Sequence, residues 1–237
     1  MLRTVMYGDT SVICTIYTEL FGVQGYIMKG VRKGTRKSAP KMNYFQPASI
    51  LELIVQHHPL KQLQFVKEVQ WAILYNQVST NVVRNGIAMY IIELLQHSLK
   101  QPEAHPELYY LVEDTLKQLD SGNETLAANL PLYFMLHLSS ELGFRITDNF
   151  SDRRPILDLQ EGAYVEETPS HPYYLADRAA RLIADLSHIQ FYNELENFKV
   201  NRELRRQGLY ALQDYFKLHI SDFGELKTYS ILQEILG

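Results

Sequence analysis

Residues 29–41 read Lys-Gly-Val-Arg-Lys-Gly-Thr-Arg-Lys-Ser-Ala-Pro-Lys and divide a β-rich segment in two. Gly30, Gly34 and Pro40 interrupt the stretch, which is typical of a loop rather than a helix. Cations can neutralise phosphates and release counterions, so a basic loop favours nucleic-acid binding; the alternative is a solvated loop without a ligand. The stretch has no acid, and its six cations are the predicted contacts: Lys29, Arg32, Lys33, Arg36, Lys37 and Lys41.

Short apolar segments rich in β-branched residues lie on both sides of this loop. Several short strands within about 75 residues, with a long loop in the middle, predict a five-stranded barrel of the oligonucleotide/oligosaccharide-binding (OB) type. Because alternate side chains point inward, we expect most aromatic rings beside the loop (Tyr17, Tyr26, Tyr44, Phe45) to lie in the core. The predicted strands are 2–6, 12–18, 23–28, 46–56 and 63–75.

The hydrophobic period becomes helical at Ser79-Thr80. Residues 143–172 have no helical period and predict an irregular insert with one short hairpin. The sequence therefore predicts an α+β protein, with an OB-fold nucleic-acid-binding domain at 1–78 and an all-α C-terminal domain at 79–237. The predicted helices start at Asn81 and cover 108–119, 126–142 (with Pro131 inside), 174–186, 200–219 and 226–236.

The net charge of −4 conceals a division between the two parts of the chain. Residues 1–78 carry nine Lys/Arg against four Asp/Glu, whereas residues 79–237 carry fourteen against twenty-three. Positive potential is therefore concentrated in the N-terminal third, where a polyanion would bind.

Other features exclude several classes of protein. The single cysteine, Cys14, rules out an intramolecular disulfide, and no apolar run approaches the roughly 18 residues of a transmembrane helix. We expect a cytoplasmic protein. The phosphate-loop pattern fails at Val31-Arg32, and no catalytic constellation is present, so the sequence predicts no enzyme.

A second basic cluster lies in the C-terminal part, at Lys199, Arg202, Arg205 and Arg206. Residues 199, 202 and 206 share one helical face. A solvated face offset by neighbouring glutamates explains this cluster as well as a binding site does.

Several short motifs, in this order and spacing, resemble the RecO family of bacterial recombination mediators. They are Leu2-Arg3-Thr4, Tyr7-Gly8-Asp9-Thr10-Ser11, Thr18-Glu19, Gly22, Lys29-Gly30-Val31-Arg32-Lys33, Lys37-Ser38, Gln46-Pro47 and Leu226-Lys227-Thr228-Tyr229-Ser230.

The resemblance implies an N-terminal OB fold and a helical C-terminal domain. It further implies a DNA repair and homologous recombination mediator that binds single- and double-stranded DNA and anneals complementary strands. Such a mediator helps to load RecA onto strands coated by single-strand binding protein (SSB), with RecR as partner, in the nucleoid. RNA-binding or translation-associated OB proteins remain the alternative function, because a basic loop does not distinguish RNA from DNA. An enzyme with an accessory OB domain is a third class.

The resemblance also implies a site for the SSB tail, which is anionic and ends in an aromatic residue, so that a basic rim around an apolar pocket is needed. We expect it at Arg202, Arg205 and Arg206, with Arg178 and Arg181 as the second candidate. Many relatives carry a four-cysteine zinc site, but residues 143–168 contain no cysteine, so no metal or other cofactor is expected. The chain begins within the family's usual first strand, and we expect its natural start further upstream.

Overall fold

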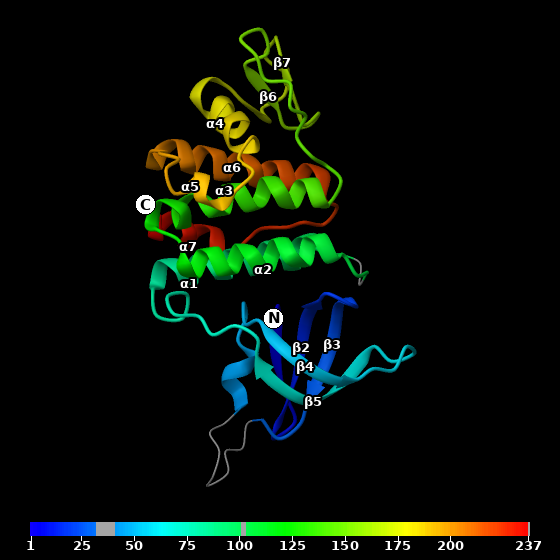
Figure 1. Cartoon of the computed structure of the whole chain (residues 1–237). Coiled ribbons are helices and arrows are strands. Elements are labelled where there is room, and N and C mark those ends of the chain that lie inside the picture. Colours follow the sequence, from blue (N-terminus) through cyan, green and yellow to red (C-terminus); the bar gives the residue numbers. More distant parts are fainter. Residues whose placement is uncertain (32–40, 101–102, 237) are drawn as a thin grey trace. The chain divides into compact units, whose positions relative to one another are not determined.

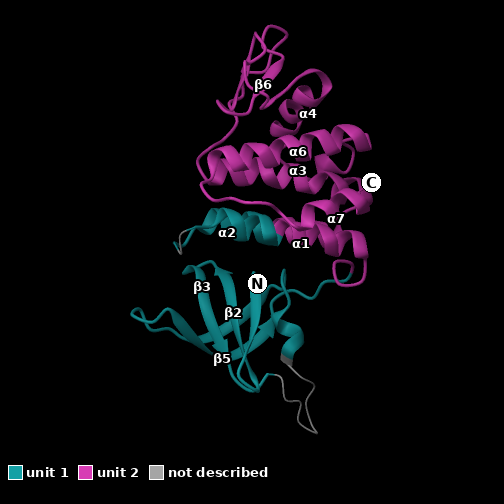
Figure 2. Ribbon diagram, turned by 180° about the vertical axis from the view of Figure 1, so that it is seen from behind, with its two compact units in different colours: residues 1–76, 92–113 teal, residues 77–91, 114–237 magenta. Residues whose placement is uncertain are grey.

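The computed structural model describes residues 1–31, 41–100 and 103–236, with Lys41 described for its backbone alone. The chain forms two compact units (Figure 2). Unit 1 contains residues 1–76 and 92–113, and unit 2 contains residues 77–91 and 114–237. Each unit is described separately below.

Unit 1 is built on a five-stranded sheet in the order β1-β2-β3-β5-β4 (Figure 1). β3 and β5 pair in parallel, and the other neighbours pair antiparallel. A short 3-10 helix, η1 (Lys41–Phe45), precedes β4. The strands are β1 (Arg3–Tyr7), β2 (Ser11–Thr18), β3 (Gly22–Met28), β4 (Leu51–Gln56) and β5 (Leu63–Trp71).

The inner face of this sheet follows from the two-residue period of the strands. Val12, Cys14 and Ile16 alternate along β2, and all three are buried in one core with Tyr26 and Phe45. The segment that precedes β4 is hydrogen-bonded to the start of the chain. Ala48 N–H donates to the Met1 carbonyl at 3.0 Å, and Thr4 Oγ1 donates to the Phe45 carbonyl at 2.6 Å.

These two hydrogen bonds occupy part of the free edge of β1, although no strand pairs with β1 on that side. The five-stranded fold is OB-like. The α+β class is confirmed.

The C-terminal region is largely helical, with a small sheet. Pro131 lies within a single continuous helix. The fourth helix begins at Asp177, three residues later than predicted, because Tyr174–Leu175 pairs as a strand instead. The helices are α1 (Val82–Ser98), α2 (Pro106–Ser121), α3 (Glu124–Glu141), α4 (Asp177–Ser187), α5 (Tyr192–Leu195), α6 (Arg202–His219) and α7 (Thr228–Ile235).

The segment expected to be irregular contains the predicted hairpin and part of a three-stranded sheet. Its strands are β6 (Ile156–Asp158), β7 (Ala163–Val165) and β8 (Tyr174–Leu175), in the order β7-β6-β8. Asn149 extends the pairing through its side chain. Its Oδ1 accepts from Tyr164 N–H at 2.8 Å, and its Nδ2 donates to the Tyr164 carbonyl at 3.0 Å. His171 Nε2 lies 3.3 Å from the buried Asp158 carboxylate.

Within unit 2, Arg84 of α1 donates hydrogen bonds to carbonyl groups at the C-terminal end of α2. The last carbonyls of a helix have no partner within the helix. The Arg84 guanidinium donates to the carbonyls of Leu119 and Gly122, the latter at 2.7 Å, and only 5% of this arginine is exposed. Asp120 completes the junction by accepting the N–H groups of Gln77 and Val78 at 2.7 and 2.8 Å.

Replacing Arg84 by methionine should destabilise the protein, because two buried carbonyls would lose their charged donor. We expect a loss of about 2 kcal/mol or more and a fall in Tm of roughly 4 to 8 °C. The matched control is Arg153→Met at an exposed position, which should stay within about 0.5 kcal/mol. Equal Tm values for the two variants in thermal denaturation would contradict this role.

A second prediction concerns whether the protein binds a structural metal ion. Among residues 1–31, 41–100 and 103–236, no group of three or more His, Cys, Asp or Glu side chains is arranged to hold a metal ion. We expect purified protein to contain no stoichiometric zinc and a chelator to leave Tm unchanged. Asn149→Ala should lower Tm, because it removes two bonds that hold the insert. One zinc per chain in elemental analysis would overturn the prediction.

Candidate nucleic-acid interface

The outer face of the barrel carries an apolar row that crosses four strands. Strand register pairs Val5 with Ile13, Ile13 with Ile27, and Ile27 with Phe65. These side chains lie on the face opposite the core, because their neighbours Val12, Cys14 and Val66 are buried inside it. The row is exposed at its ends, where Phe65 is 42% exposed and Val5 47%, whereas Ile27 in its middle is buried.

Lys29 places a cation beside the exposed Phe65 ring. Its Nζ lies 5.1 Å from the ring centre, within the range of a cation–π interaction. Gly30 follows with a φ of +74°, which lies in the left-handed region that glycine favours. The chain thus leaves the barrel into the basic loop next to an outward-facing ring.

The structure places only part of the predicted basic loop. Arg32, Lys33, Arg36 and Lys37 lie outside the described residues. Lys41 begins η1, and its side chain is also outside the description. Lys29 is therefore the predicted contact whose side chain has an observed position, and that position is on the outer face.

Most of the aromatic rings that flank the loop in sequence are buried, although alternation with the inward-facing Ile16 places Tyr17 on the opposite face of the sheet. Tyr17, Tyr26 and Phe45 are buried, and Tyr44 is partly buried and stacks on Trp71 with ring centres 4.9 Å apart. Two other rings on the strands, Tyr7 and Phe65, are exposed. The sequence analysis did not identify either ring as a candidate ligand contact. Alternation separates the two faces of each strand, but only the strand register brings Phe65 next to Lys29.

The predicted partner-binding arginines of the C-terminal part have different environments. Arg205 is half-buried and connects α6 to α3: it donates to Asn129 Oδ1 at 3.3 Å and to the Val200 carbonyl at 3.0 Å. Burial lowers the pKa of its guanidinium. Arg205 thus has a role within the fold, whereas Arg202 and Arg206 are exposed.

Arg206 belongs to a surface that we name the α6–α7 patch, which consists of Arg202, Arg206, Tyr210 and Tyr229. Arg206 and Tyr210 lie one turn apart on α6, and Tyr210 is 60% exposed. Burial, and then the neighbouring Tyr210, raise the pKa of Tyr229 to about 12, and Arg206 acts on it in the opposite direction. The Arg206 guanidinium also pairs with Glu203 at 2.8 Å.

The second candidate pair lies on α4. Arg178 and Arg181 are exposed, and Arg181 pairs with Asp185 at 3.7 Å. The large apolar side chains of this helix, such as Leu182 and Ile183, are buried. Of the two candidates, the α6–α7 patch is the one that combines exposed cations with exposed ring surface on the same helix.

No helix among the described residues is long and apolar enough to cross a membrane.

The chain is similar to known proteins along its whole length. The family model "Recombination protein O N terminal" matches residues 1–75, and "Recombination protein O C terminal" matches residues 79–228. The DNA repair protein RecO of Christiangramia forsetii is 28% identical over 237 residues, covering 100% of this chain and 97% of the relative. The DNA repair protein RecO of Phocaeicola vulgatus is 29% identical over 239 residues, again covering 100% and 97%.

A third relative, the DNA repair protein RecO of Porphyromonas gingivalis strain W83, is 28% identical over 238 residues and is covered to 96% of its length. The two family models together match both the barrel and the helical region. This chain therefore belongs to the RecO family of DNA repair and recombination proteins.

Proposed function

We propose that this chain is a non-catalytic mediator that binds single- and double-stranded DNA and anneals complementary strands. With RecR as partner, it would help to load RecA onto strands coated by SSB, in the cytoplasm at the nucleoid. The observation that carries the proposal is the outward-facing Phe65 with the Lys29 ammonium over its ring, at the root of the basic loop.

This arrangement provides both interactions that sequence-independent binding of a single strand requires. Cations neutralise the phosphates, and an exposed ring stacks on any base because every base has a π-face. Phe65 and Lys29 supply one of each on the same outer face. The loop cations Arg32, Lys33, Arg36, Lys37 and Lys41 would extend the phosphate track beyond the barrel.

The charge division assigns separate roles to the two parts of the chain. Residues 1–78 carry a net charge of +5 and would form the DNA-binding domain, whereas residues 79–237 carry −9 and would repel DNA over most of their surface. Family membership favours DNA over RNA as the ligand. A competition between matched RNA and DNA oligonucleotides separates these two readings, and a preference for RNA would overturn the proposal.

The dependence of DNA affinity on salt tests the basic loop. Six contacts to a single strand should give a slope of log K against log salt of about −4, at roughly −0.7 per contact. Changing Arg32, Lys33, Arg36 and Lys37 together to glutamine should reduce its magnitude by about 3. The charge-matched control changes Arg153, Arg154, Arg178 and Arg181 to glutamine and should keep the wild-type slope. An unchanged slope in the loop variant would remove the loop from the DNA site.

We infer further that the SSB tail binds the α6–α7 patch. An acidic peptide with an aromatic end needs cations beside an apolar surface, and Arg206 lies one turn before the exposed Tyr210 on α6, with Arg202 one turn before Arg206. These arginines also lie in the first turns of α6, where the helix dipole favours anions. Arg205 is excluded from this role because its guanidinium binds Asn129 and Val200.

Changing Arg202 and Arg206 to glutamine should weaken binding of a labelled tail peptide by about 5- to 30-fold, at up to ~1 kcal/mol for each exposed ion pair. Fluorescence anisotropy measures this loss, and circular dichroism verifies that the helices remain. DNA binding should be retained. The comparison variant Arg178/Arg181→Gln should bind the peptide like wild type, and the reverse pattern would move the site to α4.

A further inference from the structure

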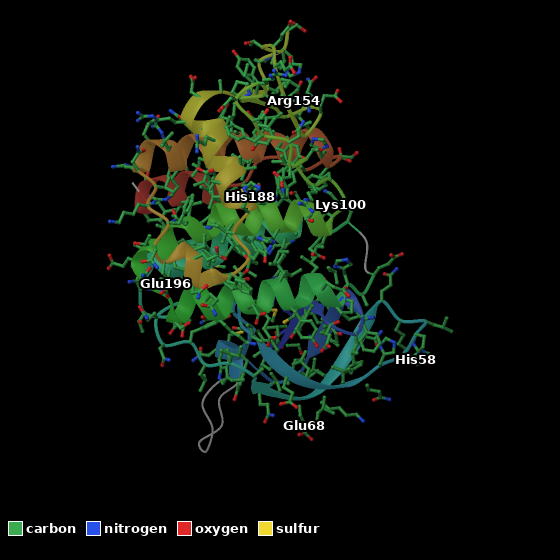
Figure 3. The ribbon with its side chains drawn as sticks, turned by 45° about the horizontal axis from the view of Figure 1, so that its top comes forward. His58, Glu68, Lys100, Arg154, His188 and Glu196 are labelled. Carbon is green, nitrogen blue, oxygen red and sulfur yellow. The ribbon has the colours of Figure 1, made fainter. Side chains whose placement is uncertain are left out.

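Two turns of unit 1 meet through a pair of stacked rings that does not include Lys29 or Phe65. Phe21 belongs to the turn between β2 and β3, and His57 begins the β4–β5 hairpin tip, which we define as residues 57–62. The two rings are nearly parallel, at 11°, with centres 4.1 Å apart. The hairpin tip projects from the barrel (Figure 1), and Figure 3 labels His58 on it. The His57 residue is exposed.

A buried amide holds the hairpin tip in one conformation. Gln64, which is 1% exposed, accepts the His58 N–H at 2.7 Å and donates to the carbonyls of His58 and Lys61 at 3.0 and 2.6 Å. Lys61 N–H also donates to the His58 carbonyl at 3.0 Å and closes the turn. The other turn is fixed by Thr18, whose Oγ1 accepts the Phe21 N–H at 3.1 Å. Preorganised turns of this kind lose little entropy when a ligand binds.

This rigid structure presents apolar surface to water. Leu60 is 91% exposed and Leu20 is 73% exposed. The segment 56–62 contains no acid and one cation, Lys61. The surface therefore combines a ring stack, apolar side chains and a positive charge, which are the groups that contact bases and backbone in single-strand complexes.

The parallel pairing of β3 with β5 connects this surface to the Lys29–Phe65 pair. Gly25 lies opposite Leu63 and Ile27 opposite Phe65, so both surfaces lie along the same two strands. In the β4–β5 ladder Phe65 lies opposite Gln56, the residue before His57, so the His57 end of the stack lies close to Phe65 along the chain register. The Phe21 end lies six residues before Ile27, or about 20 Å at ~3.3 Å per residue, a distance that about six nucleotides at ~3.4 Å each would cover. An OB fold engages about 4 to 16 nucleotides, so one strand can reach both surfaces.

We propose that the hairpin tip is a second nucleobase-stacking site, in which a base of single-stranded DNA stacks on the exposed face of His57, with Phe21 behind it. This proposal rests on the proposed DNA-binding function and adds a contact outside the basic loop. A protein partner could also use exposed leucines. The parallel ring pair, the absence of acids in 56–62 and the continuity with Phe65 favour a nucleobase.

The test compares two adjacent exposed histidines of the same hairpin tip. His57→Ala removes the exposed ring of the stack, and the matched control His58→Ala keeps the main-chain groups that Gln64 binds. The probe is a labelled 15-nucleotide oligothymidylate in fluorescence anisotropy at several salt concentrations. We expect His57→Ala to weaken binding about fivefold or more, with an unchanged salt slope because no phosphate contact is lost. His58→Ala should bind within twofold of wild type.

A third variant separates stacking from charge. His57→Phe keeps a ring without an ionisable group and should bind within twofold of wild type. Wild-type affinity in His57→Ala, while wild type itself binds DNA, would overturn the stacking site and leave the proposed function intact. Equal losses in His57→Ala and His57→Phe would also overturn it, since a ring would not suffice. Absence of DNA binding by wild type would overturn the proposed function and this site together.

Discussion

The parallel pairing of β3 with β5 is the constraint on which the outer face of the barrel depends. It brings Gly25 against the start of β5, where a Cβ would lie 3.2 Å from the Gln62 carbonyl oxygen and 3.3 Å from a Leu63 methyl group. A bulkier residue would force these strands to shift. The same register sets Phe65 beside Ile27, so that Lys29, two residues after Ile27 and just past the end of β3, reaches its ring.

The helical unit is organised by polar groups that satisfy helix ends and by close helix contacts. Arg84 satisfies the carbonyls at the end of α2, and Arg205 joins the start of α6 to Asn129 of α3. Gly86 and Gly208 lie where helices approach closely: an added Cβ would clash with the Ile235 side chain at the first position and lie 3.2 Å from Leu132 at the second. Arg205 is thereby turned inward, while Arg202 and Arg206 on the same helix remain exposed.

A recombination mediator must act on DNA of any sequence, and the proposed interface suits that requirement. Phosphate neutralisation by lysine and arginine is independent of sequence, and stacking on rings such as Phe65 tolerates every base. Base-specific recognition would instead use bidentate hydrogen bonds in a groove. Residues 1–78 carry an excess of positive charge and residues 79–237 an excess of acids. Under the proposed function, this division would hold DNA at the barrel and leave the helical region for protein partners.

The sequence alone determined the α+β class, the five strands of unit 1 to within five residues, and six of the seven helices of the described residues to within about three, because hydrophobic periodicity reports which face of each element is buried. It also determined the charge division. It missed β8 and the four-residue helix α5, which are too short to show a period. Only the tertiary structure decided which outward rings and cations come together. Phe65 meets Lys29, Phe21 meets His57, and Arg205 turns inward through contacts between residues far apart in the chain, which no local pattern encodes.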